Sequence, residues 1–369
     1  MSDETRRAPA GFALHDAGGA ITAQGTAEAV IGDDDLRVGP VTVAFLDADT
    51  LRVADYRIEL GCWPSGTLAL SQFGRRFDTF SEELRRSRSQ ARVAGLLAHG
   101  ISMPVVFPAA VLGGGTAGPA ECQVFQTHVT IVPMDTDPWQ LPLGALTAVE
   151  ASDDPPAVVL QARDGSRTVV GRLARRRDEF RRAVAERRDA QGQLLTSLTG
   201  STVFADGHGV ERIQVPGFDA MVAQRSAPAR AECATALLGR ARGGEPRLGF
   251  VQLIDPDADA LEAQSALPEH WASFLLVPVG SLTVLEVLAG PSAATYVFEA
   301  PIEAVNHDLQ LLHFRRGALA LRGPDAELTP QNPCRLALRR LEPLIRLRAA
   351  IRARIIHSES WRDVMASAL

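Results

Sequence analysis

The sequence predicts an α+β fold in which antiparallel β-sheet units, each closed by a long C-terminal helix, are repeated along the chain. Three observations indicate this. Short segments alternate apolar and polar residues with a period of two, which is typical of half-buried antiparallel strands. Each group of such segments is followed by an arginine-rich stretch with helical periodicity. Similar spacings recur in the two halves of the 369-residue chain, which indicates an internal duplication.

The composition is that of a globular protein. Hydrophobic residues make up 46% and charged residues 22% of the chain, so each unit has enough apolar side chains to bury a core. The formal net charge of -6 gives no overall attraction to nucleic acid or to an anionic membrane. The sequence contains no lysine, and this bias is typical of a bacterial genome rich in GC. The four cysteines are scattered singly, which indicates buried thiols in a reducing cytoplasm.

The first segment, residues 1–27, is expected to be a disordered lead-in. It is polar and glycine-rich, and it has no apolar run, so it does not resemble a signal peptide. No stretch of the chain reaches the roughly 18 apolar residues of a membrane span, so no transmembrane segment is expected.

A first β unit is expected over residues 28–100. Two alternating segments each place apolar residues on one face: Val41, Val43 and Phe45, and then Tyr56, Ile58 and Leu60. A helix follows, in which Thr79 and Glu82 have the spacing of a capping box and Phe77 is placed for a hydrophobic staple. This helix is expected to end at Gly100.

A second β unit is expected over residues 101–200. A glycine-rich connector, 113–118, precedes its main strands. Strands are predicted over 122–133, 146–150, 158–162 and 168–171. A charged helix from about Arg175 to Leu198 closes the unit, with Phe180 and Val184 on its apolar face.

The second half is expected to contain a truncated strand–helix unit, 201–245, and a third β unit, 246–369, with an arginine-rich C-terminal helix. Phe77-Asp78 is followed by Leu96-Leu97 after the same number of residues that separates Phe218-Asp219 from Leu237-Leu238. Val159-Leu160 is likewise matched by Leu311-Leu312. Residues 121–198 are therefore predicted to overlay 271–357, strand for strand.

The last helix is predicted over about 335–357. Leu344, Leu347, Ile351 and Ile355 recur at steps of three and four, so they share one side of a helix that would be buried.

The order of strands followed by one closing amphipathic helix resembles the pleckstrin-homology-like superfamily, including its GRAM-type members. The segments that carry the resemblance are 28–99 and 121–198, and more weakly 271–357. The resemblance implies a curved sheet capped by a helix, and a binding or scaffolding role. The lipid-binding members carry basic residues in the first hairpin loop, whereas the candidate loops here contain Asp33-Asp34-Asp35 and Asp135-Thr-Asp137. These carboxylates repel phosphate, so phosphoinositide binding is not expected.

The sequence shows no motif for a catalytic, metal or cofactor site. Glycines 113–118 lead into a strand, whereas a phosphate-binding P-loop needs a lysine and a following helix. Asp255, Asp257 and Asp259 lack the glycine and the glutamate that an EF-hand requires. The eight histidines form no HExxH or HxH pair. We therefore expect no enzyme activity and no metal, nucleotide or covalent cofactor.

The arginine-rich helices are the remaining candidates for interaction. The candidate partner-binding residues are Arg175, Arg176, Arg181, Arg182, Arg188, Arg346, Arg352 and Arg354. Interleaved carboxylates favour pairing within the helix near 175–189. The final helix has a surplus of arginine, which could pair with acidic loops, a partner protein or nucleic acid.

Three functions stay open. The first is a non-catalytic protein-interaction or scaffold module in the cytoplasm, acting on a protein partner or as a homo-oligomer. The second is binding of an anionic surface, membrane or nucleic acid, through the arginine-rich helices, although aromatic residues, at 5%, are scarce for single-stranded nucleic acid. The third is an enzyme of unknown type.

Overall fold

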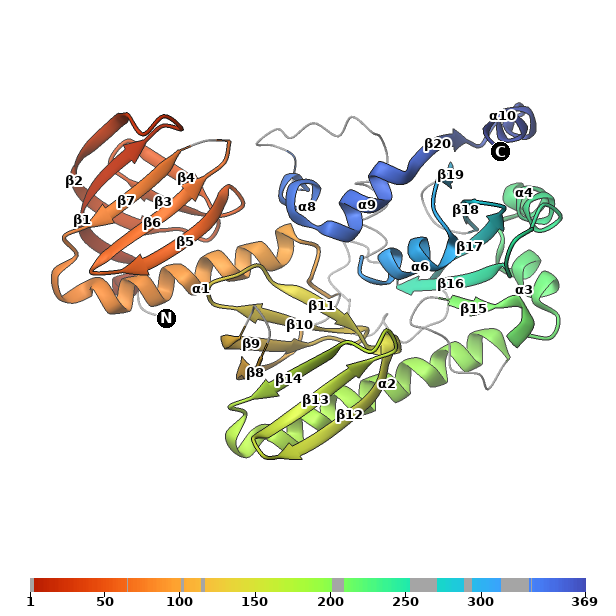
Figure 1. Ribbon diagram of the computed structural model, residues 1–369, viewed down its shortest axis with the longest axis horizontal. Coiled ribbons are helices and arrows are strands. Elements are labelled where there is room, and N and C mark those ends of the chain that lie inside the picture. The colour runs from red at the N-terminus through yellow and green to blue at the C-terminus, as the bar shows by residue number, and fades with distance from the viewer. Residues whose placement is uncertain are drawn as a thin grey trace.

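The chain folds into three antiparallel sheets with helices between and around them (Figure 1). The computed structural model describes residues 3–64, 66–100, 103–113, 117–200, 209–252, 271–288, 294–312, 332 and 334–369. The predicted α+β class, rich in antiparallel sheet, is confirmed at this level.

The first sheet contains seven strands. They are β1 (Arg7–His15), β2 (Ile21–Ile31), β3 (Asp35–Val38), β4 (Val41–Ala44), β5 (Ala48–Ala54), β6 (Arg57–Cys62) and β7 (Thr67–Ser71). Their spatial order is β4-β3-β2-β1-β7-β6-β5. Helix α1 (Phe77–Gly95) runs beneath this sheet and places Phe77, Phe80 and Leu84 in its core (Figure 1).

The disordered lead-in predicted over residues 1–27 is wrong, because β1 is the central strand of the first sheet. β1 lies between β2 and β7, and Ala8 and Ala10 are fully buried. Alanine carries little strand signal in a sequence, yet its small side chain suits the crowded interior of a curved sheet.

Two details of the first unit are also corrected. Tyr56 is 75% exposed at a turn with positive φ, whereas Ile58 and Leu60 are buried as predicted. The predicted capping box is absent, because α1 begins at Phe77, two residues before Thr79, and Arg76 stands at its N-cap without a side-chain hydrogen bond.

The second sheet has the same strand order as the first. Its strands are β8 (Val105–Val111), β9 (Gly118–Val124), β10 (His128–Pro133), β11 (Trp139–Pro142), β12 (Leu146–Asp153), β13 (Pro156–Ala162) and β14 (Arg167–Gly171). They follow the order β11-β10-β9-β8-β14-β13-β12. Helix α2 (Arg177–Thr199) closes the unit, and Phe180 and Val184 lie in its core.

The first two units have the same order of strands and helix, with equivalent elements 100 residues apart. β7 and β14 share their bounds at this offset, as do the short 3-10 turns Gly74–Arg76 and Ala174–Arg176. The matched residues are Phe73 with Leu173, Arg75 with Arg175, Arg76 with Arg176, Asp78 with Asp178, and Phe80 with Phe180.

The third sheet has a different topology, so the predicted overlay of 121–198 on 271–357 is wrong. Its strands are β15 (Gly209–Glu211), β16 (Arg247–Gln252), β17 (Trp271–Val279), β18 (Leu282–Val287), β19 (Ala294–Phe298) and β20 (Ile351–Ile356), in that spatial order. Within the segment 271–357, residues 302–310 form helix α6 (Ile302–Gln310), where the strand-for-strand overlay does not allow a helix. The expected truncated unit 201–245 is not separate either, because β15 is an edge of this sheet.

The predicted last helix over 335–357 is wrong in its second half. The segment forms α8 (Arg335–Arg340), α9 (Glu342–Ala350) and then strand β20, which pairs with β19. Leu344 and Leu347 are buried on α9 as expected, but Ile351 and Ile355 belong to the strand. The β-branched isoleucines suit a strand, and pairing with β19 overrides the helical spacing.

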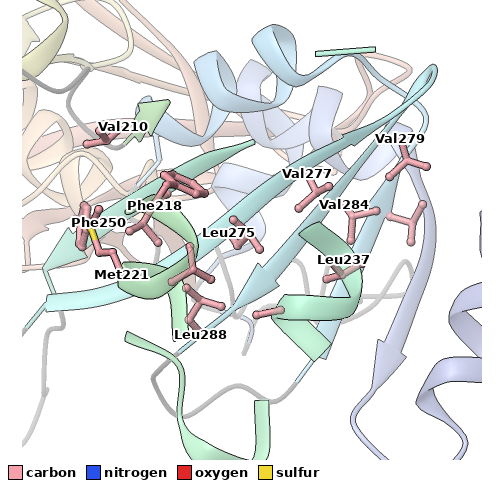
Figure 2. Packing of buried hydrophobic residues seen from close by; sticks show 14 of the residues in the cluster. Val210, Phe218, Met221, Leu237, Phe250, Leu275, Val277, Val279, Val284 and Leu288 are labelled. Atoms are coloured by element: carbon pink, nitrogen blue, oxygen red, sulfur yellow. The ribbon is translucent and has the colours of Figure 1, made fainter. Parts of the chain in front are cut away.

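The third sheet is buried on both faces, and every residue of β18 and β19 is buried. One face packs under α3 (Phe218–Arg225), α4 (Pro228–Leu238) and α10 (Trp361–Ala368), through residues such as Leu237, Leu275 and Val284 (Figure 2). The other face packs under α6, α8 and α9. Leu195 of α2 joins the core shown in Figure 2, so the helix that closes the second unit also enters the third.

Candidate functional site

The candidate arginines of α2 lie on the outer part of that helix. Within the described part of the chain, Arg175, Arg181 and Arg182 are exposed and form no ion pair. Arg188 pairs with its neighbour Asp189 at 3.2 Å. These four arginines are therefore largely solvated, but the pairing within the helix that the interleaved carboxylates favoured is not found for Arg175, Arg181 and Arg182 in the described structure.

Arg176 has a structural role. Its guanidinium pairs with Glu179 at 2.8 Å, donates to the carbonyl of Val106 at 2.9 Å, and stands 4.2 Å from the centre of the Phe107 ring. The pairing with Glu179 raises the pKa of Arg176 above its ordinary value. Arg176 thus fastens the start of α2 to the first strand of its own sheet.

The candidate arginines near the C-terminus do not join those of α2. Arg346 on α9 binds Asp308 of α6 at 2.6 Å, and the Asp308 carboxylate is buried. Arg352 and Arg354 are exposed on β20, and Arg352 pairs with Glu299. The expectation that arginines of this segment contact acidic residues of the same chain is met for Arg346 and Arg352, while a single arginine face is not formed.

The arginines that matter most to the architecture were not among the candidate residues, although the surplus arginine of the C-terminal segment was expected to pair with acidic loops. We use the name arginine junction for a cluster where the first unit, the second unit and α8 meet. Its arginines are Arg88, Arg92, Arg335, Arg339 and Arg340, and its carboxylates are Asp47, Asp49 and Asp137. Asp47 lies in the loop between β4 and β5, and Asp49 is the second residue of β5. Asp137 lies in the loop between β10 and β11.

Two arginines of α1 form the floor of the junction. Arg88 is 1% exposed and donates to the carbonyls of Ala48 and Asp49, both at 2.9 Å. Arg92 is fully buried, and its Nε lies 2.7 Å from Asp137. Burial lowers the pKa of both guanidiniums, that of Arg88 to about 10, with the charge of Arg92 adding to the effect at Arg88. Both remain cations at neutral pH.

Helix α8 supplies the roof of the junction. Arg335 pairs with Asp47 at 2.8 Å, and Arg339 pairs with Asp49 at 2.9 Å while its guanidinium stacks 4.5 Å from the centre of the Trp63 ring. Arg340 shares Asp137 with Arg92. The three units are therefore fixed to one another by charge pairs that are mostly buried, and such pairs are geometrically selective.

A glycine permits the close approach. A Cβ at Gly95, the last residue of α1, would stand 2.4 Å from Cδ2 of Leu46 and 3.0 Å from Cδ2 of Leu336, so a larger residue would push these two side chains aside where α1, α8 and the β4–β5 loop meet. The sequence signal for the junction is weak: the stretch 87–92 carries arginines with no acid among them, unlike the matching part of α2.

Beside the junction lies a cavity of about 930 Å³, which we name the inter-unit cleft. One wall is strand β11 of the second sheet, and the other is formed by α6 and α9 of the third unit. The side chain of Gln140 on β11 donates to the carbonyl of Leu311 after α6, and this bond connects the two walls.

The charges around the inter-unit cleft are balanced. Its charged lining residues, four basic and four acidic, are Arg163, Arg247, Arg340, Arg346, Asp137, Asp164, Glu303 and Glu342. Between them lie apolar side chains that include Trp139, Leu141 and Leu341. Asn306 of α6 also faces the cleft, and its Oδ1 is buried without a hydrogen-bond partner among the residues that the structure describes.

A second polar cluster lies under α10. Glu286 on β18 is fully buried and accepts a hydrogen bond from Thr295, while His357 lies 2.8 Å from its other oxygen. Trp361 Nε1 donates to the Thr295 hydroxyl at 2.8 Å. The cluster fastens the C-terminal helix to the third sheet.

Neither a metal-binding group nor a membrane helix is found in the described residues. Across them, no three His, Cys, Asp or Glu side chains are placed to hold a metal ion. No helix among them is long and apolar enough to cross a membrane.

Comparison with known proteins gives no functional lead. No family model matches the chain, and no curated protein matches it. Among solved structures, the C-terminal domain of an unknown protein from Leishmania infantum is similar to part of the chain, with 9% identity over 24% of this chain and 84% of that one, and a TM-score of 0.22.

Proposed function

We propose that this chain is a non-catalytic protein-interaction or assembly module, in which two pleckstrin-homology-like units are held against a third sheet. The observation that supports it best is the inter-unit cleft. Its two walls come from different units, and the arginine junction beside it fixes those units in position. A binding surface assembled from two units needs such a fixed arrangement, because ordering mobile parts on binding weakens affinity.

The pleckstrin-homology-like part of the proposal is supported by element order. Both of the first two sheets run 4-3-2-1-7-6-5 in the numbering of their own strands, and a helix follows the last strand of each. The carboxylates of Asp47, Asp49 and Asp137 are engaged by arginines, so the acidic loops of this chain act in internal assembly.

A photo-crosslinking experiment tests the proposal. A benzoylphenylalanine replaces His307, which is exposed and lines the cleft, and in a matched control it replaces Tyr56, which is exposed on the first unit. We expect the cleft position to capture a defined protein in the native cells and the control position not to. That protein, once purified, should bind the full chain in titration calorimetry. Failure of both measurements would argue against an interaction module.

One observation favours a second function, binding of an anionic surface. Arg175, in the 3-10 turn before α2, and Arg181 and Arg182 on α2 are exposed cations outside any ion pair in the described structure. Co-sedimentation with phosphatidylserine vesicles at about 0.05 and about 0.2 M salt tests it, since phosphate-type contacts weaken steeply with salt. Salt-sensitive binding that is lost when all three arginines are replaced by alanine supports this function.

A further inference from the structure

We propose that an extended segment of a partner protein adds to the free edge of β11 as an eighth strand of the second sheet, held in the inter-unit cleft by α6 and α9. This inference rests on the proposed interaction function and names the partner's chemistry: a short extended peptide without a run of one charge. Peptides commonly bind in this way, because the edge of a sheet presents unpaired backbone groups.

The register of β11 shows which backbone groups are free. The amide of Leu143 donates to the carbonyl of Thr127 at 2.9 Å, and these residues continue the register in which Pro142 faces His128 and Leu141 faces Val129. Hydrogen-bonded pairs alternate along an antiparallel ladder. Residues 139, 141 and 143 therefore bond to β10, while the backbone groups of residues 140 and 142 point to the open edge.

The open edge has a defined donor and acceptor pattern. Gln140 offers an N–H and a carbonyl, whereas Pro142 offers only a carbonyl because proline has no N–H. No backbone bond from Gln140 to another described residue is found outside the ladder. The single edge amide at Gln140 therefore sets the register of an added strand.

The opposite wall contains a polar atom that lacks a partner. Asn306 is 3% exposed, and its Oδ1 forms no hydrogen bond in the described structure. A buried acceptor without a donor is unfavourable, so such groups are normally satisfied by a partner or a ligand. A backbone amide of an added strand is a donor of the right kind.

The size and charge of the cleft select the occupant. Its volume of about 930 Å³ lies within the range of ligand sites. A strand that faces the four residues of β11 spans about 13 Å. Three arginine–carboxylate pairs of the lining, Arg340–Asp137, Arg247–Glu303 and Arg346–Glu342, already compensate one another. The cleft therefore attracts neither a polyanion nor a polybasic segment, and a peptide without a run of one charge fits best.

One edge of the third sheet is protected against such an addition. On β20, the terminal strand of the third sheet, Arg352 and Arg354 are exposed, and charged side chains discourage strand addition at an edge. β11 carries no charged residue and is limited only by Pro138 and Pro142 at its ends.

The test uses a displayed library of random 12-residue peptides selected against the full chain. A selected peptide is synthesised and its affinity for the full chain is measured by titration calorimetry. Gln140→Pro removes the edge N–H, and Gln140→Ala is the matched control that keeps it and loses only the side-chain bond to Leu311. We expect affinity to fall about tenfold or more in Gln140→Pro and less than about threefold in Gln140→Ala. Hydrogen exchange should show the Gln140 amide protected by the peptide.

Asn306→Leu provides a second measurement that does not depend on how Gln140→Pro folds. Replacing an unsatisfied buried amide by an apolar group of similar size should leave or raise the melting temperature, while peptide affinity falls. A variant that loses stability and binding together would contradict the assigned role of Asn306.

Several outcomes overturn the inference. They are the recovery of no peptide on the parent protein, equal binding to Gln140→Pro, and a Gln140 amide already protected before peptide is added, since the last would mean that the chain itself occupies the cleft. If crosslinking from position 307 captures a partner that still binds Gln140→Pro, the interaction function stands and strand addition fails. If no partner is captured either, both fail.

Discussion

Helices α1 and α2 begin alike and end differently. At a spacing of 100 residues, both follow a 3-10 turn, and both place a phenylalanine, Phe80 or Phe180, in the core of the preceding sheet. Arg76 and Arg176 donate to a carbonyl of the first strand of their sheets, at 2.8 and 2.9 Å. The first turns of each helix therefore serve its own unit.

Beyond the third turn the two helices diverge. Arg88 is 1% exposed in the arginine junction, whereas the side chain of Arg188, at the equivalent position, is 25% exposed and, among the described residues, pairs with its neighbour Asp189. α1 enters a charged contact with α8 and the second sheet, while α2 places Leu195 in an apolar core. The difference teaches that the next unit in space, and not the arginine content of the helix, decides whether an arginine is structural.

The largest loss of stability is expected at the first turns of α1 and α2, where the two helices are alike. Phe80→Ala and Phe180→Ala should each lower the free energy of unfolding by about 3–5 kcal/mol, because both side chains are fully buried in equivalent cores. Urea denaturation measures both. A large effect in one unit beside a silent change in the other would break the equivalence of the two helix starts.

The next effect is expected where the helices differ. Arg92→Ala should lower the free energy of unfolding by about 3 kcal/mol, the lower end for a broken buried pair, since Arg340 keeps Asp137 paired. Arg188→Ala should change it by less than about 0.5 kcal/mol. Arg92→Met serves as the control that keeps side-chain length. Equal losses at positions 92 and 188 would refute a structural difference between the helices.

A pH titration sharpens the comparison between the first two sheets. Burial raises the pKa of the Cys122 thiol in the second sheet from 9.0 to about 12, and burial also raises that of Cys62 in the first. Between about pH 9 and pH 12 the unfolded chain loses the Cys122 proton while the folded chain keeps it. This thiol therefore contributes full stability below pH 9, and the contribution falls by about 1.4 kcal/mol per pH unit above it.

The measurement is urea denaturation at several alkaline pH values. Cys122→Ala should have a shallower loss of stability with pH than the parent, and Cys62→Ala should differ less from the parent. An unchanged slope in Cys122→Ala would contradict the shielding of this thiol by the second core.

The smallest effect concerns the two anchoring arginines. Arg76→Ala and Arg176→Ala should each cost about 0.5–1.5 kcal/mol, the usual net value of a hydrogen bond, and the two costs should be similar. Thermal unfolding of the two variants side by side measures this. If the free energies of unfolding of the two variants differed by more than about 2 kcal/mol, the two arginine–carbonyl contacts would not be equivalent.

The sequence predicted what depends on local pattern. The strands of the second sheet near β9, β10, β12, β13 and β14 were found because alternation and β-branched residues mark them. β1 and β2 were missed because their buried residues include alanines, whose apolar signal is weak. β20 was taken for helix because Ile351 and Ile355 fit a helical step, and only pairing with β19 decides against it.

The candidate site was predictable only in part. Arg346 was identified, and its acidic partner Asp308 lies 38 residues away. The arginine junction was not identified, because Arg335 meets Asp47 across 288 residues of chain and no local pattern records that contact. The inter-unit cleft forms only where the second unit packs against the third. No local pattern in the sequence shows that these two units lie side by side.

The course of α2 limits how this chain can be divided. Its 23 residues span about 34 Å, with Phe180 in the second core and Leu195 in the third. A fragment that ends at Thr199 exposes Leu195 to water, and a fragment that starts at Gly209 lacks part of one wall of its core. Helix α2 therefore belongs to the cores of both the second and the third unit. Moving either unit alone into another protein would require a new sequence for the apolar face of that helix.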